Sequence, residues 1–426
     1  MSSTTRNFNN MLNEYITNDL ASEALLKRDW FVQNVPKDNG WKGGAMPVPF
    51  YGTKASSIKM GGLTADTDVA KYSYVRGSVT GYKEAWGTLR FEHGDLIDHD
   101  GQVNEKSFLK ILPRQIDEFG DTMKEQMSKI LLTGSVAFKA TGVGSAGGVV
   151  AVDHVERIML DQKFVLDEGA ANQDVYVIAI DLNLNGGQIT VSATRGGVGL
   201  DLTALAVPVI AGVGFYYDGV LVAGVVTNVF SDLRSSLLST ANGGSATLYG
   251  QSKVAYPYLQ AINLLATAAN IDLTSVAKVK LGIFNGYNEI RKKARGNANT
   301  VLMSFKLLGS LMASLEDQKG AFKVTATAEK ASLYGWTEIT IVSVRGTLKV
   351  VGIQEMDDDV IIYLDMEAVM YYSNGELIRK RVAPDGKQYY EQRSATGYFY
   401  LLDMAALGEL VLHAPTKCGI IYGINY

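Results

Sequence analysis

Three patterns in the sequence could support ligand or metal chemistry, and the most specific is glycine-rich. Gly142-Val-Gly-Ser-Ala-Gly147 has the G-x-G-x-x-G spacing of a dinucleotide-binding loop. Such a loop needs a strand before the glycines and a helix after them, because the helix N-terminus binds the pyrophosphate. Here a long helical pattern precedes the glycines, and Val149-Val-Ala-Val152 follows them. We interpret residues 142–148 as a flexible, hinge-like loop.

The other two patterns are acidic. Asp98-His-Asp-Gly101 resembles a calcium loop, but placing Gly101 at position six puts Leu96 and Ser107 where the ion needs carboxylates. A charged turn before a helix explains this segment better. Asp357-Asp-Asp359 is interpreted as a solvated turn between two strands, with a surface cation site as the alternative.

The residue inventory offers little material for an active site. Cys418 is the single cysteine, which excludes an intrachain disulfide and a cysteine-built metal site. The sequence has no phosphate-loop, nucleophile-elbow or zinc-helix motif. Carboxylate pairs stay open, because any two could meet in the fold. We therefore expect no enzyme activity, no cofactor and no catalytic or metal-binding residues; the four histidines are scattered at His93, His99, His154 and His413.

Composition limits the partners. The 426 residues carry a formal net charge of −4, whereas a nucleic-acid binder needs a basic surface to release phosphate counterions. DNA could lie beside this protein without being bound specifically. The apolar run 202–217 is interrupted by Pro208, Gly212 and Gly214, so we interpret it as strands and expect no membrane contact. Residues 215–222 predict a hairpin that turns at Asp218-Gly219.

Two N-terminal segments lack a clear core of their own. Residues 1–50 place aromatics among glycines and prolines, and residues 51–95 predict an extended hairpin. In the hairpin, Tyr74 and Arg76 share one strand face and Val75 and Val79 the other. A two-stranded ribbon is marginal alone and needs its own domain or another chain to lie against. The candidate inter-subunit contacts are Trp30, Trp41, Tyr72, Tyr74, Arg76, Trp86 and Arg90.

The elements that would position these segments follow. Apolar residues at steps of three and four predict a helix over 108–131, kinked or started by Pro113 and ended at Gly134. Residues 165–230 predict a small barrel or sandwich with a turn at Asn185-Gly186. Beyond them, helices are predicted over 257–268, 274–295 and the segment ending at 315, strands over 301–305, 339–344, 348–351, 360–364 and 420–426, and turns at 374–375 and 385–386.

The order of these parts resembles the Hong Kong 97-like fold of tailed-bacteriophage major capsid proteins. Three stretches carry the resemblance directly: 243–257, which includes Tyr249-Gly250 and Tyr256-Pro257, then 347–365, and finally 398–403 with 414–419. The resemblance implies an α+β chain with five parts: an N-terminal arm (1–50), an extended loop (51–95), a peripheral domain with a spine helix (96–164 and 366–400), a β-rich insertion (165–235) and an apical domain (236–365 and 401–426).

The resemblance also implies a role. The chain would self-assemble as pentamers and hexamers into an icosahedral shell that encloses DNA, with the arm and the extended loop lying on neighbouring subunits. Expected partners are a separate scaffolding protein, a portal protein and a decoration protein, and the expected location is the virion after assembly in the host bacterial cytoplasm. Lys54, Lys59 and Lys71 carry no specific signature of a cross-link, and none is predicted.

Two alternatives remain open at the level of sequence. An encapsulin-type compartment shell shares the fold but encloses cargo enzymes, although encapsulins are usually shorter and lack such a β insertion. A ligand-binding protein or hydrolase would instead use the interior of the predicted 165–230 barrel.

Overall fold

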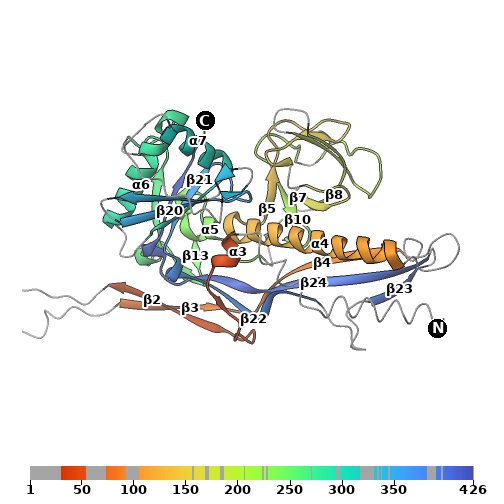
Figure 1. The fold of residues 1–426 in the computed structure, drawn as a ribbon, viewed down its shortest axis with the longest axis horizontal. Helices are drawn as coiled ribbons and strands as arrows, with labels where there is room; N and C mark the ends of the chain where they lie inside the picture. The colour runs from red at the N-terminus through yellow and green to blue at the C-terminus, as the bar shows by residue number, and fades with distance from the viewer. Residues whose placement is uncertain are drawn as a thin grey trace, which may run out of the picture. The chain divides into compact units, whose positions relative to one another are not determined.

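A computed structural model describes most of the chain, in two compact units. The described residues are 30–53, 73–92, 105–155, 158–167, 172–182, 187–205, 207–222, 225–226, 229–269, 271–293, 298–316, 331–332, 335–336, 338–343, 346–380, 390–394 and 397–425. The main unit is Met1–Ser128 with Ser231–Tyr426, and the barrel unit is Lys129–Phe230. Helices and several separate sheets make the chain α+β, as predicted (Figure 1).

The larger core of the main unit is a six-stranded mixed sheet covered on one face by two helices. Helices α6 (Val279–Lys293) and α7 (Phe305–Glu316) pack on alternate strand residues, among them Val301, Val350 and Ile361. Tyr363 fixes the contact with α6, because its hydroxyl donates to the Ile283 carbonyl at 2.9 Å. The strand order is β15 (Ile262–Leu265), β25 (Gly419–Tyr422), β21 (Val360–Leu364), β16 (Thr300–Met303), β20 (Gly346–Gly352) and β19 (Glu338–Ser343).

The elements of this sheet confirm most of the helices and strands predicted for them and correct one. The predicted helix over 257–268 is wrong: a 3₁₀ turn at Pro257–Leu259 is followed by β15, which pairs in parallel with β25. A short apolar run cannot distinguish a buried strand from a helix by periodicity alone. The pairing with β25, over 150 residues away, decides the outcome.

A second sheet of the main unit supports the spine helix. Helix α4 (Glu105–Thr133) runs through Pro113 and ends at Gly134, whose φ of 98° suits a glycine and whose N–H donates to the Ile130 carbonyl. Gly87 allows the close approach of α4, because a Cβ there would lie 2.7 Å from the Phe119 ring. The sheet contains β1 (Lys37–Asp38), β22 (Val369–Lys380), β24 (Gly397–Leu412) and β23 (Tyr390–Ser394), with β4 (Lys83–Glu92) also paired to β24.

The predicted turn at Asn374-Gly375 is wrong, because these residues lie inside β22. The pairing of β22 with β24 shifts register between Ser373 and Ile378, which marks a bulge. Gly375 has a φ of 96°, and the Ser373 hydroxyl donates to the Gly375 carbonyl at 2.8 Å. An Asn-Gly pair thus serves the bulge as well as it would serve a turn. The turn predicted at 385–386 lies outside the described residues.

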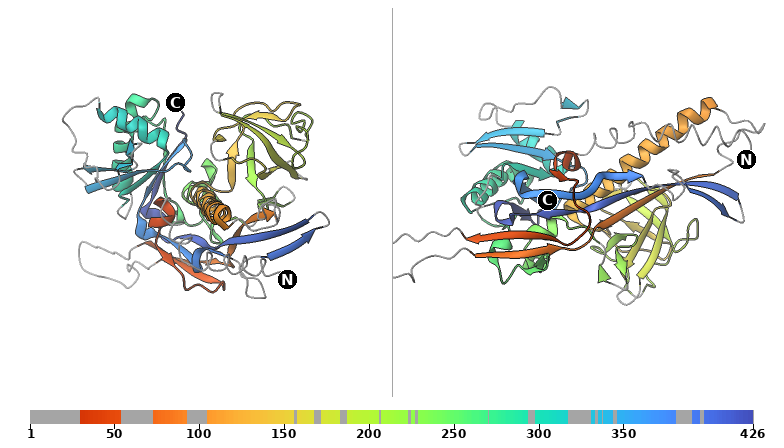
Figure 2. Two further views of the ribbon diagram at one scale, coloured as in Figure 1. Left: turned by 45° about the vertical axis from the view of Figure 1, so that its right-hand side comes forward. Right: turned by 90° about the horizontal axis from the view of Figure 1, so that it is seen from below.

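The barrel unit is built from six antiparallel strands. Their order is β5 (Val136–Lys139), β10 (Gly214–Tyr217), β7 (Lys163–Asp167), β8 (Asn172–Asp181), β9 (Gln188–Ser192) and β6 (Val149–Ala151). The end strands close on each other through the bridge between Ala140 and Val152, where the Thr141 N–H donates to the Ala151 carbonyl at 2.8 Å. Of the predicted barrel or sandwich, the structure has a closed barrel, but its first strand starts at Val136 and not at residue 165. Its yellow-to-green strands are seen from two sides in Figure 2.

Side chains from all six strands fill the barrel. At its centre, Phe138 stacks on Phe215 with ring centroids 4.6 Å apart and meets Phe164 edge-on at 4.9 Å. The hairpin predicted at residues 215–222 is wrong, because β10 pairs with β5 and β7, while β11 (Leu221–Val222) pairs with β12 (Val225–Val226).

The glycine-rich loop belongs to this barrel and is not a free hinge. The Gly144 N–H donates to the Val209 carbonyl, and the Gly148 carbonyl accepts from the Val191 N–H. Gly144 also packs so closely on Leu202 that a Cβ would lie 2.6 Å from it. Strand β6, not a helix, follows the glycines. The loop is therefore pinned by the barrel and does not have the setting of a dinucleotide site, as expected.

The closed barrel with its own core should fold independently. We expect residues 129–230 expressed alone to unfold cooperatively, and Phe138→Ala to lower their free energy of unfolding by about 3–5 kcal/mol, because it leaves a cavity between two aromatic rings. Urea denaturation followed by circular dichroism measures both. A broad, non-cooperative transition of the wild-type fragment would contradict an autonomous core.

Candidate inter-subunit surface and its anchors

The extended hairpin has two different faces. Its strands are β2 (Met46–Thr53) and β3 (Ser73–Val79), paired in antiparallel fashion. Val48, Phe50 and Val79 are buried, at 0%, 2% and 6% exposure. They pack on the main unit, together with Leu248, Leu259 and Val411. Hence this face of the hairpin lies against its own chain, which is one of the two possibilities that the sequence left open.

The opposite face is open in this chain. Tyr74, Arg76 and Ser78 alternate with the buried positions and are exposed, and Tyr74 exposes 66% of its surface. Pro47 and Pro49 lie directly across from Ser78 and Arg76 and are also exposed. This face, called the outer face below, combines an aromatic ring, a guanidinium and two prolines on a flat ribbon. The predicted division of the strand into two faces is confirmed.

The outer edge of β2 is built against strand addition. The Ser78 N–H and the Arg76 carbonyl both point away from β2, toward residues 249–251. Pro47 and Pro49, opposite them, therefore direct their missing N–H positions to the free edge of β2. A strand without donors at two successive outward positions is a poor template for a further strand. A partner would contact the outer face rather than extend the sheet.

Tyr249 holds the inner face of the hairpin in place. It forms, with Gly250, the turn between β13 (Thr247–Leu248) and β14 (Gln251–Ser252), and its φ of 47° is rare for a residue with a side chain. Its ring stacks on Phe50 at 6.0 Å. Its hydroxyl accepts from the Leu412 N–H at 2.7 Å and donates to the Leu410 carbonyl. One side chain thus joins the hairpin to β24.

The remaining predicted contact residues lie in different settings. Trp41 packs edge-on against Tyr82 at 4.8 Å, where it serves its own chain. Trp30, in α3 (Trp30–Asn34), lies 5.0 Å from the Lys349 ammonium, within reach of a cation–π contact. Trp86 is 49% exposed on β4 and donates to Glu84. Strand β4 pairs with β24 and not with the hairpin. Tyr72 and the side chain of Arg90 lie outside the described residues.

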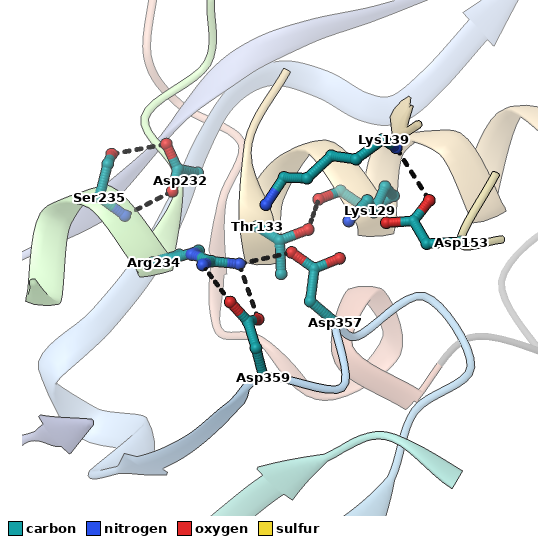
Figure 3. A network of polar contacts seen from close by, with 9 residues as sticks. All are labelled: Lys129, Thr133, Lys139, Asp153, Asp232, Arg234, Ser235, Asp357 and Asp359. Carbon is teal, nitrogen blue, oxygen red and sulfur yellow. Dashed lines mark hydrogen bonds and ion pairs between the residues drawn. The ribbon is translucent and has the colours of Figure 1, made fainter. Parts of the chain in front are cut away.

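A cluster of charges anchors the segment at which the chain re-enters the main unit. Helix α5 (Leu233–Leu237) starts at Asp232, whose carboxylate caps the Ser235 N–H at 2.6 Å. Arg234 then binds Asp357 at 2.7 Å and Asp359 at 2.6 Å (Figure 3). The two carboxylates raise the pKa of the Arg234 guanidinium against the effect of its burial. Residues 357–359 form a turn between two strands, as predicted, and the Asp359 side chain is 39% exposed, but Asp357 and Asp359 are also paired with Arg234, which the sequence did not indicate.

Lys253 is the most enclosed cation of this cluster. It is 1% exposed, and its ammonium donates to the carbonyls of Ser235, Ser236 and Leu238, at 2.7–3.0 Å. Those carbonyls lie at the end of α5, where no later helical turn supplies donors; of the three, the Ser235 carbonyl also accepts from the Ser245 N–H. Lys253 therefore serves as a side-chain cap. No local pattern indicates this role, because Lys253 stands fifteen residues after Leu238 in the sequence.

The cysteine and one histidine have specific surroundings in the described residues. Burial raises the pKa of the Cys418 thiol to about 12, which keeps it from acting as a nucleophile near neutral pH. His413 hydrogen-bonds Tyr372 at 3.0 Å. Within the described ranges, no group of three His, Cys, Asp or Glu side chains could hold a metal ion. Over the same ranges, no helix has the length and apolarity to span a membrane.

Comparison with known proteins gives similarities of structure alone. No family model and no curated protein matches the chain. The chain of the cyanophage A-1(L) capsid asymmetric unit is 13% identical, with 92% of this chain and 91% of that one covered and a TM-score of 0.44. The capsid of the native GTA particle is 10% identical, with 94% of this chain and 91% of that one covered and a TM-score of 0.43. The SrpI encapsulin of Synechococcus elongatus PCC 7942 is 6% identical, with 94% of this chain and 90% of that one covered and a TM-score of 0.42. These values do not establish a family.

Tyr249 offers a direct test of the hairpin anchor. We expect Tyr249→Phe to lower the free energy of unfolding of the main unit by about 1–2 kcal/mol, because the Leu412 N–H loses its acceptor. Tyr258→Phe is the matched control, since the buried Tyr258 hydroxyl has no hydrogen-bond partner among the described residues. Chemical denaturation of both variants measures the difference. Equal stability of the two would show that the Tyr249 hydroxyl is not an anchor.

Lys253 offers a second test. Lys253→Met keeps most of the side-chain volume but leaves the buried carbonyls of Ser236 and Leu238 without the ammonium donor, so we expect a loss of roughly 2–4 kcal/mol in unfolding free energy. Lys42→Met removes an exposed lysine and should change stability by less than about 0.5 kcal/mol. Denaturation curves of both variants decide the matter, and a Lys253→Met protein as stable as wild type would exclude the cap.

Proposed function

We propose that this chain is the major capsid protein of a tailed bacteriophage, which self-assembles into the icosahedral head shell around the genome. The observation that carries the proposal is the two-faced hairpin. Its inner face is fixed to its own chain through Val48, Phe50 and Tyr249, while its outer face stays exposed. An exposed face that combines a tyrosine, an arginine and two prolines has the residue types that are common at protein interfaces, and it suits contact with a second copy of the chain.

The arrangement of elements supports the same proposal. In chain order there are a hairpin, a 29-residue helix on a sheet, a closed barrel, a mixed α/β core and a late return of long strands to the helix-bearing sheet. This is the order expected of the Hong Kong 97-like capsid fold with an inserted domain. The expected domain limits, the pentamers and hexamers, and the contacts of the arm remain part of the proposal.

The barrel does not favour the ligand-binding alternative. Phe138, Phe164 and Phe215 occupy its centre, with apolar side chains from every strand around them. Barrels of this size are filled by their own side chains unless a cavity is built in. A structural role for the barrel unit on a shell therefore fits better than a substrate site, and we propose that the chain is not an enzyme.

The proposed contents of the shell follow from the charge of the chain, and the proposed partners from the resemblance to capsid proteins. With a net charge of −4, the protein would enclose DNA without gripping it. A separate scaffolding protein, a portal protein and a decoration protein are the proposed partners, in a virion assembled in the bacterial cytoplasm. An encapsulin-type shell is the second candidate, since the same outer face would serve it.

Electron microscopy of the expressed full chain, alone and with a candidate scaffolding protein, tests the proposal. We expect uniform shells or capsomers. A monodisperse monomer at high concentration under both conditions would contradict the shell function. Nucleic acid inside particles purified from infected cells supports a phage capsid, whereas cargo protein supports the compartment shell.

The outer face predicts a separation of folding from assembly. We expect the double variant Tyr74→Ala and Arg76→Glu to fold with an unchanged melting temperature but to lose most of its assembly, because both side chains are exposed in the single chain. Lys292→Glu, an equally exposed charge reversal on α6, is the control. Light scattering during assembly measures the effect. Normal assembly of the double variant would remove the outer face from the proposal.

A further inference from the structure

A buried carboxyl group holds the residue at which the chain returns from the barrel unit. The main unit resumes at Ser231, and the backbone N–H of Ser231 donates to Glu409 Oε1 at 2.5 Å. Glu409 lies on β24, paired with Tyr372 of β22, and is 2% exposed. A carboxyl group enclosed to this degree is tolerated far more easily in its neutral form than as an ion.

The groups around Glu409 offset only part of the free-energy cost that burial imposes on its ionised carboxylate. Lys83 on β4 supplies positive charge, and Ser231 supplies hydrogen bonds, both of which favour the ionised carboxylate. Tyr371 of β22, Tyr249 of the β13–β14 turn and Asp232 at the α5 cap face the same region and add no positive charge. Burial outweighs the favourable contacts and raises the pKa of Glu409 to about 7.

We propose that Glu409 is a pH-sensitive latch, which holds residues 231–238 on β24 while it is protonated and loosens them as it ionises. Ionisation places a charge where water cannot reach it, so the state in which residues 231–238 move away and admit water becomes relatively more favourable. The latch stands on the enclosure of Glu409 and its contact with Ser231, and it does not depend on the proposed capsid function.

The sign of the pH dependence follows from the two states. A glutamate in water has a pKa near 4.5, whereas the latched Glu409 has one of about 7. The latched state therefore binds more protons than the loosened one. Its additional stability from Glu409 is fully present below pH ~4.5 and is lost as the pH rises through about 7. Arg234 stays charged throughout this range, and burial lowers the pKa of His413 below its usual 6.5, so His413 is neutral above pH ~6.5. Burial also lowers the pKa of Lys253 to about 8, which by the same linkage favours the latched state as the pH rises and so opposes the effect of Glu409. Burial raises the pKa of Asp232, in the same direction as Glu409, and only replacement of Glu409 separates the two.

Hydrogen exchange on the full chain tests the latch at pH 6 and pH 8, after correction for the intrinsic pH dependence of exchange. In wild type, we expect amides 231–238 to lose about tenfold in protection between the two values, with α7 amides unchanged. Glu409→Gln keeps an acceptor for Ser231 but cannot ionise, so it should abolish the loss. Glu367→Gln, at an exposed glutamate, should keep it.

Two outcomes would overturn the latch. One is a Glu409→Gln protein that loses protection at 231–238 as wild type does. The other is a parallel loss in α7, which would mean that the whole unit, not this segment, responds to pH. If Glu409→Gln does not fold, a wild-type pH series decides: the protection of 231–238 should fall along a single-proton curve near pH 7, and a flat series excludes the latch.

Discussion

The hairpin must bury one face, and the rest of the main unit is arranged to let it do so. A two-stranded ribbon does not stay folded alone in water. Burial of Val48, Phe50 and Val79 contributes on the order of 1.5–3 kcal/mol for each side chain. Tyr249 adds the contact that fixes direction, because it stacks on Phe50 while its hydroxyl is bonded at both sides to β24. Because the inner face is fixed to the main unit, the outer face is held in one orientation for contact with a partner.

Buried charged side chains fix the segment at which the chain returns from the barrel unit, as apolar burial fixes the hairpin. Three interactions satisfy polar groups of residues 231–238 that would otherwise lack partners. Asp232 caps the Ser235 N–H, Asp357 and Asp359 bind Arg234, and the ammonium of Lys253 binds the Ser236 carbonyl. Such networks define one geometry rather than add much net stability. Burial shifts the pKa of three groups at this segment: it raises that of Asp232, lowers that of Lys253 to about 8 and raises that of Glu409 to about 7. Glu409 is the one that holds the Ser231 N–H.

Local patterns predicted the elements whose signals are local. The spine helix followed from seven apolar residues at steps of three and four, and the strands of the mixed sheet from β-branched runs that are buried on both faces. The same patterns failed where pairing with distant strands decides. Residues 257–268 became β15 because β25 lies beside them, and Asn374-Gly375 became a bulge because β24 continues past it.

The candidate surface was predictable only in part, for a related reason. The alternation of Tyr74 and Arg76 with Val75 and Val79 gave the two faces of the hairpin, but not which of them its own chain covers. That depends on Tyr249 and Val411, which are far away in sequence. Trp41 packs against Tyr82 of its own unit, since a glycine- and proline-rich segment can still fold back on that unit, and its contact with another chain stays a prediction.

The central claim is that the outer face of the hairpin is covered by a second copy of the chain. Oxidative footprinting of Tyr74 tests it most directly, by comparing unassembled protein with purified particles. Tyr74 exposes 66% of its surface in the single chain, so we expect strong labelling before assembly and a several-fold decrease in particles. Equal labelling of Tyr74 in both states, with particles formed, would show that no second copy covers the outer face.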